Sequence, residues 1–469
     1  MSHAANQSTP AANTPLGRWL VLIVALVGWL GAGVDMAVTQ LVGRAAMIDL
    51  LDRAGELDAQ QFAQFNKQFG SDRKANPASS SGELSPERKQ LDAWRTLVGQ
   101  WFARFMCAFL FGAAAGGLLF GWVGDRFGRA RGMAASIVCY SAMAGAAYHA
   151  QTPVQLLGAW FLACLGVGGM WPNGVALLSE AWGGMSRSMV SGVMGVAANI
   201  GLFLMNTLAT RPGFGVTPES WRWTMLIAAA PLVLGVFAWL FVPESPKWLA
   251  LRRGNAERPA QPPVAMGEVF RPPLLGITVV AIALATIPMM GGWGSASWMQ
   301  PWASEVGEAA SPPDTALQAR VGQIRALPGM LGSLLGGWIA VALGRRLTFF
   351  LVSLCAFGIA EYIYGYLVPT DALFLPFVGA LGFFSGIYYG WLPLCLPELF
   401  PTRSRSTGAG VGFNFGRIIT ALTLVAADPL LRYFQGDYAR IGSVTSTIFA
   451  LGMVVIWFAP DTSRRELTD

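Results

Sequence analysis

The sequence predicts an all-α polytopic membrane protein with twelve transmembrane helices in two pseudo-symmetric six-helix halves. Three observations support this prediction. Of the 469 residues, 54% are hydrophobic and 12% are charged, and that is about half the charge of an ordinary soluble domain. Apolar runs of roughly 20 residues, long enough to cross a bilayer as helices, recur along the chain. Short motifs of the first half also return in the second half.

The expected spans follow from the apolar runs taken in order. The polar N-terminal segment is too weakly basic for a signal peptide, so we expect the first run to be retained as a helix. A transmembrane β-barrel would show shorter segments with alternating polarity. The predicted helices cover residues 19–42, 99–122, 132–149, 154–178, 188–209, 221–242, 273–299, 321–343, 347–368, 372–395, 405–427 and 441–459.

An internal repeat divides the chain into two halves. The motif GWVGDRFGR from Gly121 returns as GWIAVALGR from Gly337, and SEAWGGMSRSMVSG from Ser179 returns as PELFPTRSRSTGAG from Pro397. Duplicated six-helix units are typical of secondary transporters, whose binding site lies between the halves near the midplane. The expected organisation is a tail at 1–18, a first half at 19–242, a cytoplasmic linker at 243–272, a second half at 273–459 and a tail at 460–469.

The first outer loop contains an insertion at about 50–98. It predicts two short amphipathic helices, GELDAQQFAQFNKQFG and SPERKQLDAWRTLVG, around the segment NPASSSGELS. An outer cap, an interaction surface and a tolerated insertion are all compatible with this pattern, and the last is favoured.

The distribution of Lys and Arg predicts the orientation. Sixteen of these residues fall in the expected inner segments and six in the short outer loops, which places both termini in the cytoplasm and the protein in the plasma (inner) membrane. The long first outer loop holds eight Lys and Arg, but it also holds eight acids, and long loops translocate regardless of charge. Topology therefore explains the net charge of +6.

Several function classes lack their signatures in this sequence. There are two histidines, and the five cysteines lie in apolar segments without metal-ligand spacing. No nucleophile elbow, phosphate loop, nucleotide domain or selectivity-filter repeat is recognisable. We therefore expect no enzyme, no ATP-driven pump, no channel, no cofactor and no bound metal.

Three blocks resemble the major facilitator superfamily. GWVGDRFGRARG resembles its Gly-x-x-x-Asp-Arg-x-Gly-Arg signature, and WRW with VPESPKWL, together with LPELFPTRSRSTGAGVGFNFGR, resembles its sugar-porter-like and organic-acid branches. GWLGAGVD, LGVGGMWPNG and GFNFGRI are most similar to the sialate:proton and aromatic-acid:proton symporters. The chain departs from these families at Val38, where they tend to carry a second acid, and at Trp160 and Met170, where they tend to carry an Arg and a Glu. The resemblance implies the major facilitator fold.

Few ionisable residues fall within the expected spans, and a charge in the bilayer core is costly enough to indicate function. Asp35 lies about two turns from the outer end of the first span, and Arg104 about one turn from the outer end of the second. Because these spans are adjacent and antiparallel, we expect the two groups to face each other or share the cavity. Asp35 is then the candidate for proton coupling and Arg104 a candidate for substrate binding. A fixed bridge between them is the alternative.

Arg417 lies midway along the span 405–427, where its guanidinium could clamp a carboxylate through two hydrogen bonds. The internal repeat places it opposite Asn199. Bonding to neighbouring backbone carbonyls is the alternative role for Arg417. The remaining expected substrate-binding residues are aromatic or amide side chains: Asn173, Trp298, Tyr388 and Asn414.

Acids and arginines gather at the inner helix ends of both halves. Such charges can pair across the halves, close the cytoplasmic side and separate when it opens. The expected inner gate consists of Asp125, Arg126, Arg129, Glu180, Arg187 and Glu244 in the first half and Arg345, Arg346, Glu398 and Arg405 in the second.

These observations favour a secondary transporter that works by alternating access. The favoured substrate is a small organic anion, a carboxylate. Asp35 is the candidate residue for proton coupling, which the sequence alone does not decide. A facilitator or proton symporter of a neutral sugar or polyol is one alternative, and a transporter-like membrane sensor is another. The expected partners are a small-molecule substrate, the lipid bilayer and, as a further candidate, protons. Nucleic acid is not expected, and we expect a monomer.

Overall fold

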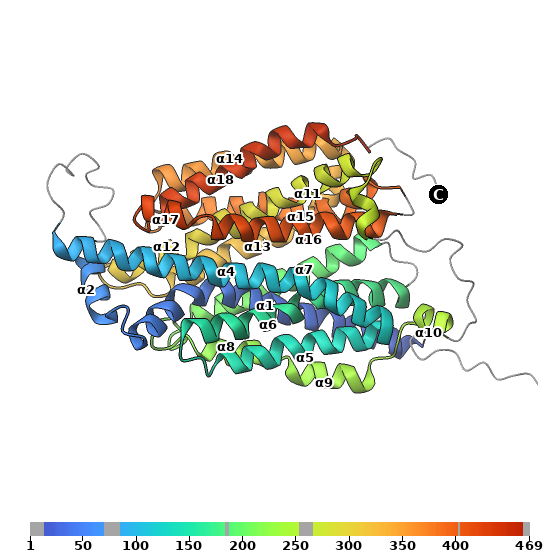
Figure 1. Ribbon diagram of the computed structural model, residues 1–469, viewed down its shortest axis with the longest axis horizontal. Helices are drawn as coiled ribbons and strands as arrows, with labels where there is room; N and C mark the ends of the chain where they lie inside the picture. Colours follow the sequence, from blue (N-terminus) through green and yellow to red (C-terminus); the bar gives the residue numbers. More distant parts are fainter. Residues whose placement is uncertain (1–13, 70–84, 183–186, 253–265, 402–403, 463–469) are drawn as a thin grey trace, which may run out of the picture.

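The computed structural model describes residues 14–69, 85–182, 187–252, 266–401 and 404–462. Figure 1 shows long helices running side by side in two groups. One group contains α1 (Pro15–Arg53), α4 (Pro86–Phe127), α5 (Arg129–Ala147), α6 (Pro153–Ala181), α7 (Arg187–Ala209), α8 (Trp223–Ala229) and α9 (Leu232–Phe241). The other contains α11 (Leu275–Met289), α13 (Leu317–Leu343), α14 (Arg345–Tyr366), α15 (Phe374–Glu398), α16 (Arg405–Val425) and α18 (Tyr438–Val455).

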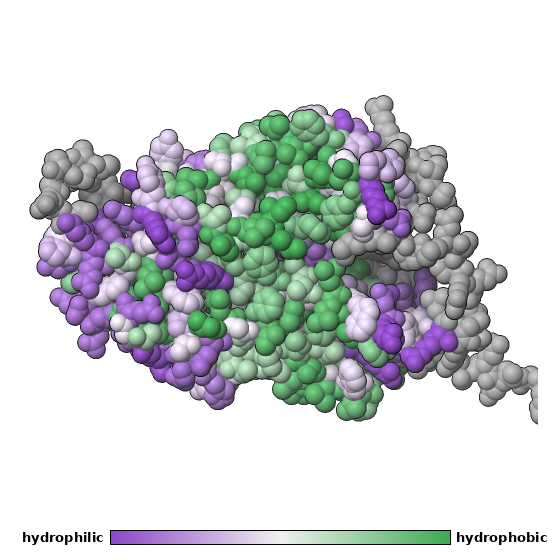
Figure 2. Space-filling model, in the orientation of Figure 1, coloured by the Kyte–Doolittle hydropathy of each residue, from purple (hydrophilic) through white to green (hydrophobic). Residues whose placement is uncertain are grey.

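The predicted helical membrane fold is confirmed. Within the described ranges, 11 helices are long and apolar enough to cross a membrane. The remaining expected span corresponds to α5, whose 19 residues begin with the arginine-rich stretch RARG. Figure 2 shows a broad apolar zone around the middle of the molecule with hydrophilic residues towards its ends. Large side chains in this zone, such as Val233, Leu240 and Trp338, are exposed because lipid is their solvent.

The two ends of the bundle differ. We call the end at which α2 (Ala59–Phe69) lies the insertion end, and the end at which α10 (Pro246–Arg252) lies the linker end (Figure 1). The first residues of α1 and the last residues after α18 both lie at the linker end, as an even number of crossings requires.

Helices α1 and α4 are longer than the sequence indicated. They contain 39 and 42 residues, whereas about 20 suffice to cross the hydrocarbon core. The first amphipathic stretch of the insertion forms α2, as expected. The second does not form a separate helix, because residues 86–98 continue without a break into the span that follows.

Two expected helices are interrupted. The span predicted at 221–242 divides into α8 and α9 around Pro231, because proline supplies no N–H to a helical hydrogen bond. The span predicted at 273–299 passes from α11 into a π-helix at Met290–Ser295, a 3₁₀ turn at Ala296–Trp298 and then α12 (Met299–Ala309). The glycine-rich stretch MGGWGS forms the π-helix, and such interruptions often occur at functional sites.

Close helix contacts repeat in the two halves. In the first half, a Cβ on Gly168 of α6 would lie 2.0 Å from the backbone carbonyl oxygen of Ala113 on α4. In the second half, a Cβ on Gly332 of α13 would lie 2.0 Å from the carbonyl oxygen of Phe383 on α15. Small residues let membrane helices approach this closely, so the repeated sequence corresponds to repeated packing.

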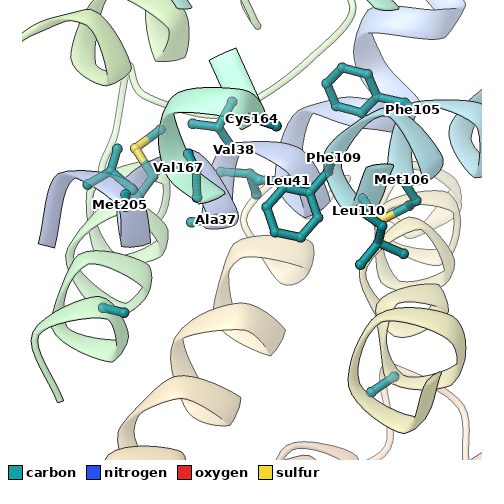
Figure 3. Packing of buried hydrophobic residues seen from close by; sticks show 14 of the residues in the cluster. Ala37, Val38, Leu41, Phe105, Met106, Phe109, Leu110, Cys164, Val167 and Met205 are labelled. Carbon is teal, nitrogen blue, oxygen red and sulfur yellow. The ribbon is translucent and has the colours of Figure 1, made fainter. Parts of the chain in front are cut away.

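The core of the first half is apolar at the positions where the sequence departs from the families it resembles. Figure 3 shows Val38 of α1 packed near Cys164 and Val167 of α6. All three side chains are buried. Trp160 is buried too, and its indole N–H donates to the hydroxyl of Thr39 at 3.0 Å. The departures from the family pattern are therefore filled by apolar packing and one neutral hydrogen bond.

Candidate functional site

The helix interruption after α11 lets the carbonyl group of Ala296 accept a hydrogen bond from an arginine side chain. Arg325 of α13 donates from Nη1 to the carbonyl oxygen of Ala296 at 3.1 Å. Its Nη2 donates to Oε1 of Gln40 at 3.2 Å. Gln40 belongs to α1, so this guanidinium connects the two halves of the protein.

Arg417 of α16 also reaches the opposite half. Its Nη1 donates to the carbonyl oxygen of Ala113 on α4 at 3.3 Å, and its Cζ lies 4.8 Å from the centre of the Phe413 ring. The backbone-bonding role foreseen as an alternative is therefore present. It uses one of the five N–H donors of a guanidinium, so most of the donor capacity remains for a ligand.

Tyr389 and Trp293 link the surroundings of these two arginines. The Tyr389 hydroxyl lies near both guanidinium groups and near the indole of Trp293, and it would lie 3.3 Å from a Cβ on the neighbouring Gly292. The Trp293 ring lies 4.4 Å from the ring of Phe109, measured between centroids. Phe109 belongs to α4, so an aromatic contact between the halves accompanies the two arginine contacts.

The charge of this region is not balanced by protein. Among the described residues, no carboxylate forms an ion pair with Arg325 or Arg417. Both lie within helices that can span the membrane, where a cation costs about 2.5–3.5 kcal/mol even on the mildest scale. Neutral oxygens are their hydrogen-bond acceptors. The region can therefore attract and bind a negative charge.

Tyr388 points away from this region. Its hydroxyl lies 2.7 Å from that of Ser353, and its ring packs against Phe349 and Phe449 within the second half. Successive residues of an α-helix project about 100° apart. The structure therefore places Tyr389, and not the expected Tyr388, beside the arginines.

The expected contact between Asp35 and Arg104 is wrong. Asp35 is fully buried, and neither carboxyl oxygen has a hydrogen-bond partner within the described residues. It interacts electrostatically with Tyr140 of α5 and Cys164 of α6. Arg104 is exposed, with its Cζ 4.7 Å from the centre of the Trp101 ring. Its neighbours Ala103 and Phe105 take the buried positions of that helical turn.

The three asparagines of the expected site lie in different environments. Asn199 faces the contact between α7 and α13, where its Oδ1 would lie 3.7 Å from a Cβ on Gly329. Asn414 faces α4, where its Oδ1 would lie 3.4 Å from a Cβ on Gly117. Asn173 is fully buried within the first half and donates to the carbonyl oxygens of Phe120 and Gly169. Asn199 and Asn414 thus lie between the halves, and Asn173 does not.

The Trp298 side chain fills the contact between the two halves towards the insertion end. It is fully buried, and its ring centre lies 5.3 Å from that of Phe102 and 5.8 Å from that of Tyr438. Phe102 comes from the first half and the other two rings come from the second. This aromatic cluster therefore seals the halves against each other.

A polar network reinforces that closure and includes the insertion. Asn66 of α2 donates to the carbonyl oxygen of Glu305 at 3.1 Å. Arg95 of α4 bonds both Asn66, at 2.6 Å, and the Glu305 carboxylate, at 2.7 Å. Arg44 of α1 pairs with Glu308 and donates to Ser304 at 3.1 Å. We call these contacts the insertion-end network.

The first half of the expected inner gate forms contacts within that half. Asp125 pairs with Arg129, and Glu180 accepts a hydrogen bond from Ser245. Glu244 accepts the backbone N–H of Ala130 at 3.0 Å. Arg126 lies over the rings of Trp122 and Phe127. The side chain of Arg187 lies outside the described residues.

The second half repeats this arrangement. Arg345 donates two hydrogen bonds to Glu398, at 3.1 and 3.2 Å, and Arg346 donates to the carbonyl oxygen of Ala459 at 2.9 Å. Arg405 is half-buried at the start of α16. The linker-end ion pairs that the structure describes thus join residues of the same half. The described contacts between the halves lie at the insertion end and the middle of the bundle, so this conformation is closed at the insertion end.

Sequence reasoning missed Arg325, Gln40, Tyr389 and Trp293 as a group. Arg325 lies four residues into the span predicted at 321–343, yet α13 begins at Leu317, eight residues before it. An earlier helix start would have placed this arginine two turns inside the span. The glycine-rich interruption at Met290–Ser295 was the other available signal.

Among the described residues, 11 apolar helices and α5 form two similar halves, with half-buried cations where the halves meet. This arrangement is typical of a secondary transporter. A family model described as Major Facilitator Superfamily matches residues 90–424, and the chain belongs to this superfamily. It is therefore a transporter and not an enzyme, as the sequence predicted.

Known transporters resemble the chain over most of its length. The cis,cis-muconate transport protein of Acinetobacter baylyi is 28% identical over 316 residues, which cover 67% of this chain and 74% of that one. The 4-hydroxybenzoate transporter PcaK of Pseudomonas aeruginosa is 24% identical, over 69% of this chain and 81% of that one. The crystal structure of a D-xylose-proton symporter matches with a TM-score of 0.66 at 16% identity, over 96% and 99% of the two chains.

Proposed function

We propose that this protein transports a small organic anion, a carboxylate, across the plasma membrane by alternating access. The observation that carries the proposal is the pair of intramembrane arginines, Arg325 and Arg417, that no described carboxylate neutralises. A carboxylate can accept two parallel hydrogen bonds from a guanidinium. The substrate would thus supply the charge balance that the protein lacks.

The relatives support this class of substrate. The names of two of them specify carboxylates, cis,cis-muconate and 4-hydroxybenzoate. The likeness to the xylose symporter concerns the fold alone. A neutral sugar would leave both arginines without a counter-charge, so the sugar or polyol alternative is less well supported.

Asp35 is the proposed proton site. An ionised carboxylate without a partner is expensive in an apolar interior, and binding a proton removes that cost. Alternating access would expose the carboxyl to the two sides of the membrane in turn. The linker end would face the cytoplasm, as the Lys and Arg distribution predicts.

Transport by the purified full chain in proteoliposomes tests this proposal. The panel contains labelled carboxylates and neutral sugars, with and without an inward proton gradient. We expect saturable uptake of a carboxylate, lowered at least about tenfold by Arg417→Gln, since hydrogen bonds to a charged group are worth about 1.5–3 kcal/mol. Arg417→Lys should retain part of the uptake because it retains the charge.

The matched control is Arg432→Gln, which removes an exposed arginine from α17 (Asp428–Tyr433) at the insertion end. Its uptake should match that of the wild type. Sugar uptake that survives Arg417→Gln, without carboxylate uptake, would overturn the proposal and establish the alternative.

A further inference from the structure

The two arginines lie at different depths along the bundle. Arg417 contacts α4 at Ala113, and the Phe109–Trp293 contact lies one helical turn nearer the insertion end. Arg325 contacts α1 at Gln40. Arg325 also donates to the carbonyl oxygen of Ala296, which comes three residues after Trp293 in the segment that runs towards the insertion end. The aromatic contact therefore lies between the levels of the two cations.

This order gives an approximate separation. Ala113 lies four residues from Phe109 along α4, and Ala296 lies three residues beyond Trp293. The levels of the two cations are thus about seven residues apart, or on the order of 10 Å at 1.5 Å per residue. Each guanidinium keeps N–H donors beyond those used by neutral oxygens. The Tyr389 hydroxyl lies near both cations and adds a polar group to the same wall.

We propose that Arg325 and Arg417 form a two-point site that selects dicarboxylates over monocarboxylates. This inference rests on the proposed function and goes further, because it assigns a second carboxylate to Arg325. One carboxylate binds at Arg417 and the other at Arg325, and the spacer between them lies against Phe109 and Trp293. A dianion balances both charges, whereas a monoanion leaves one intramembrane cation without a counter-charge.

The spacer is expected to be short and flat. The contact between Phe109 and Trp293 presents ring surfaces, and flat unsaturated or aromatic carbon skeletons pack well on such surfaces. A separation on the order of 10 Å between the cations suits a diacid whose carboxylates are separated by a few carbon atoms. A neutral ester at one end would keep the skeleton and remove one charge.

Matched ligand pairs test the proposal. The probes are adipate and terephthalate, each compared with its monomethyl ester at pH 7, where the diacid carries two charges and the ester one. Uptake into proteoliposomes and thermal stabilisation of the purified protein by each ligand are both measured. We expect each dicarboxylate to be favoured over its ester by at least about tenfold in apparent affinity, the value of one charge-assisted hydrogen-bond pair.

Variants of Arg325 test whether the second carboxylate of the substrate binds at this residue. Arg325→Gln should lower the apparent affinity for the dicarboxylate at least about tenfold and leave that for the monoester little changed. Arg325→Lys should keep the preference, and it also serves if Arg325→Gln does not fold. Arg432→Gln, which removes an exposed arginine outside the site, is the control and should keep the preference too.

The outcomes separate this inference from the proposed function. Esters that bind as well as diacids, or an Arg325→Gln variant that weakens both equally, would overturn the two-point site while carboxylate transport stands. Transport of neutral sugars without any carboxylate would overturn the proposed function itself.

Discussion

The Asp35 carboxyl is enclosed by the helices of the first half and meets no cation among the described residues. Tyr140 and Cys164 are its titratable neighbours, and neither carries positive charge. Burying a carboxylate without a compensating partner is costly. The proposed proton coupling depends on this carboxyl group, so a substitution at Asp35 tests it.

We expect Asp35→Asn to abolish accumulation driven by a proton gradient while counterflow exchange of substrate continues. Asparagine keeps the size and polarity of the side chain but cannot bind and release the proton. Two quantities are measured in proteoliposomes: substrate accumulation under an imposed proton gradient, and substrate exchange without a gradient. Glu56→Gln, at an exposed acid next to the end of α1, is the control. Accumulation by Asp35→Asn at the wild-type level would show that this carboxyl does not couple transport to protons.

At the scale of helices, packing between α4 and α6 depends on the absence of a side chain at Gly168. We expect Gly168→Ala to destabilise the protein by about 1–3 kcal/mol, the usual cost of overpacking, because the new Cβ would lie 2.0 Å from a carbonyl oxygen. Thermal unfolding in detergent measures this effect. Gly158→Ala on the same helix is the matched control, since its Cβ would have no neighbour within 4 Å. Equal stability of the two variants would contradict the packing argument.

Helix α2 gives the insertion a role in closing the insertion end. Asn66 is nearly fully buried and bonds to residues of both halves, Arg95 in the first and Glu305 in the second. Removing one partner of a buried polar network leaves the others unsatisfied, which costs about 1–3 kcal/mol. The insertion is therefore part of the contact between the halves, and its polar groups contribute to the stability of the closed state.

We expect Asn66→Ala to shift the population towards a state that is open at the insertion end. Distances between spin labels on Val154→Cys and Thr370→Cys, in a background without the native cysteines, report the separation of the halves. Both positions are exposed. Gln64→Ala, on the exposed face of α2, is the control and should keep the closed distance. An unchanged distance distribution in Asn66→Ala would exclude a gating contribution of α2.

For the whole molecule, the described contacts between the halves lie at the insertion end and the middle of the bundle, while the described linker-end ion pairs stay within each half. Alternating access would require the insertion-end network and the Trp298 cluster to separate. Charges at the linker end would then be free to meet across the halves. In the proposed transport cycle, the two-half architecture would convert this exchange of contacts into movement of the site from one side to the other.

The orientation of the whole molecule can be tested by labelling. A cysteine at Gln64, at the insertion end, should react with a membrane-impermeant maleimide in intact cells. A cysteine at Lys247 in α10, at the linker end, should react only after permeabilisation. The reverse pattern would contradict the predicted cytoplasmic termini. Protein without the native cysteines is the background for both.

The sequence by itself determined the membrane class, the helical architecture and the superfamily, and it predicted Arg417 as a candidate site residue. These depend on hydropathy, on local motifs and on the repeat, and each can be recognised along a single chain. The same information predicted the helical segment that became α2. It did not reveal the length of α1 and α4, because an amphipathic stretch beside a span can either continue the helix or leave it.

The tertiary structure decided which side chains meet. Tyr389 rather than Tyr388 lies beside the arginines, because one residue along a helix changes the facing direction by about 100°. Arg104 is exposed and Asp35 is buried without it, although the sequence predicts that the two face each other or share a cavity. Arg325 and Gln40 are far apart in the chain and meet only when the halves assemble. Helix rotation and the contact between halves are properties of the packed molecule, and a pattern of residue types along the chain does not specify them.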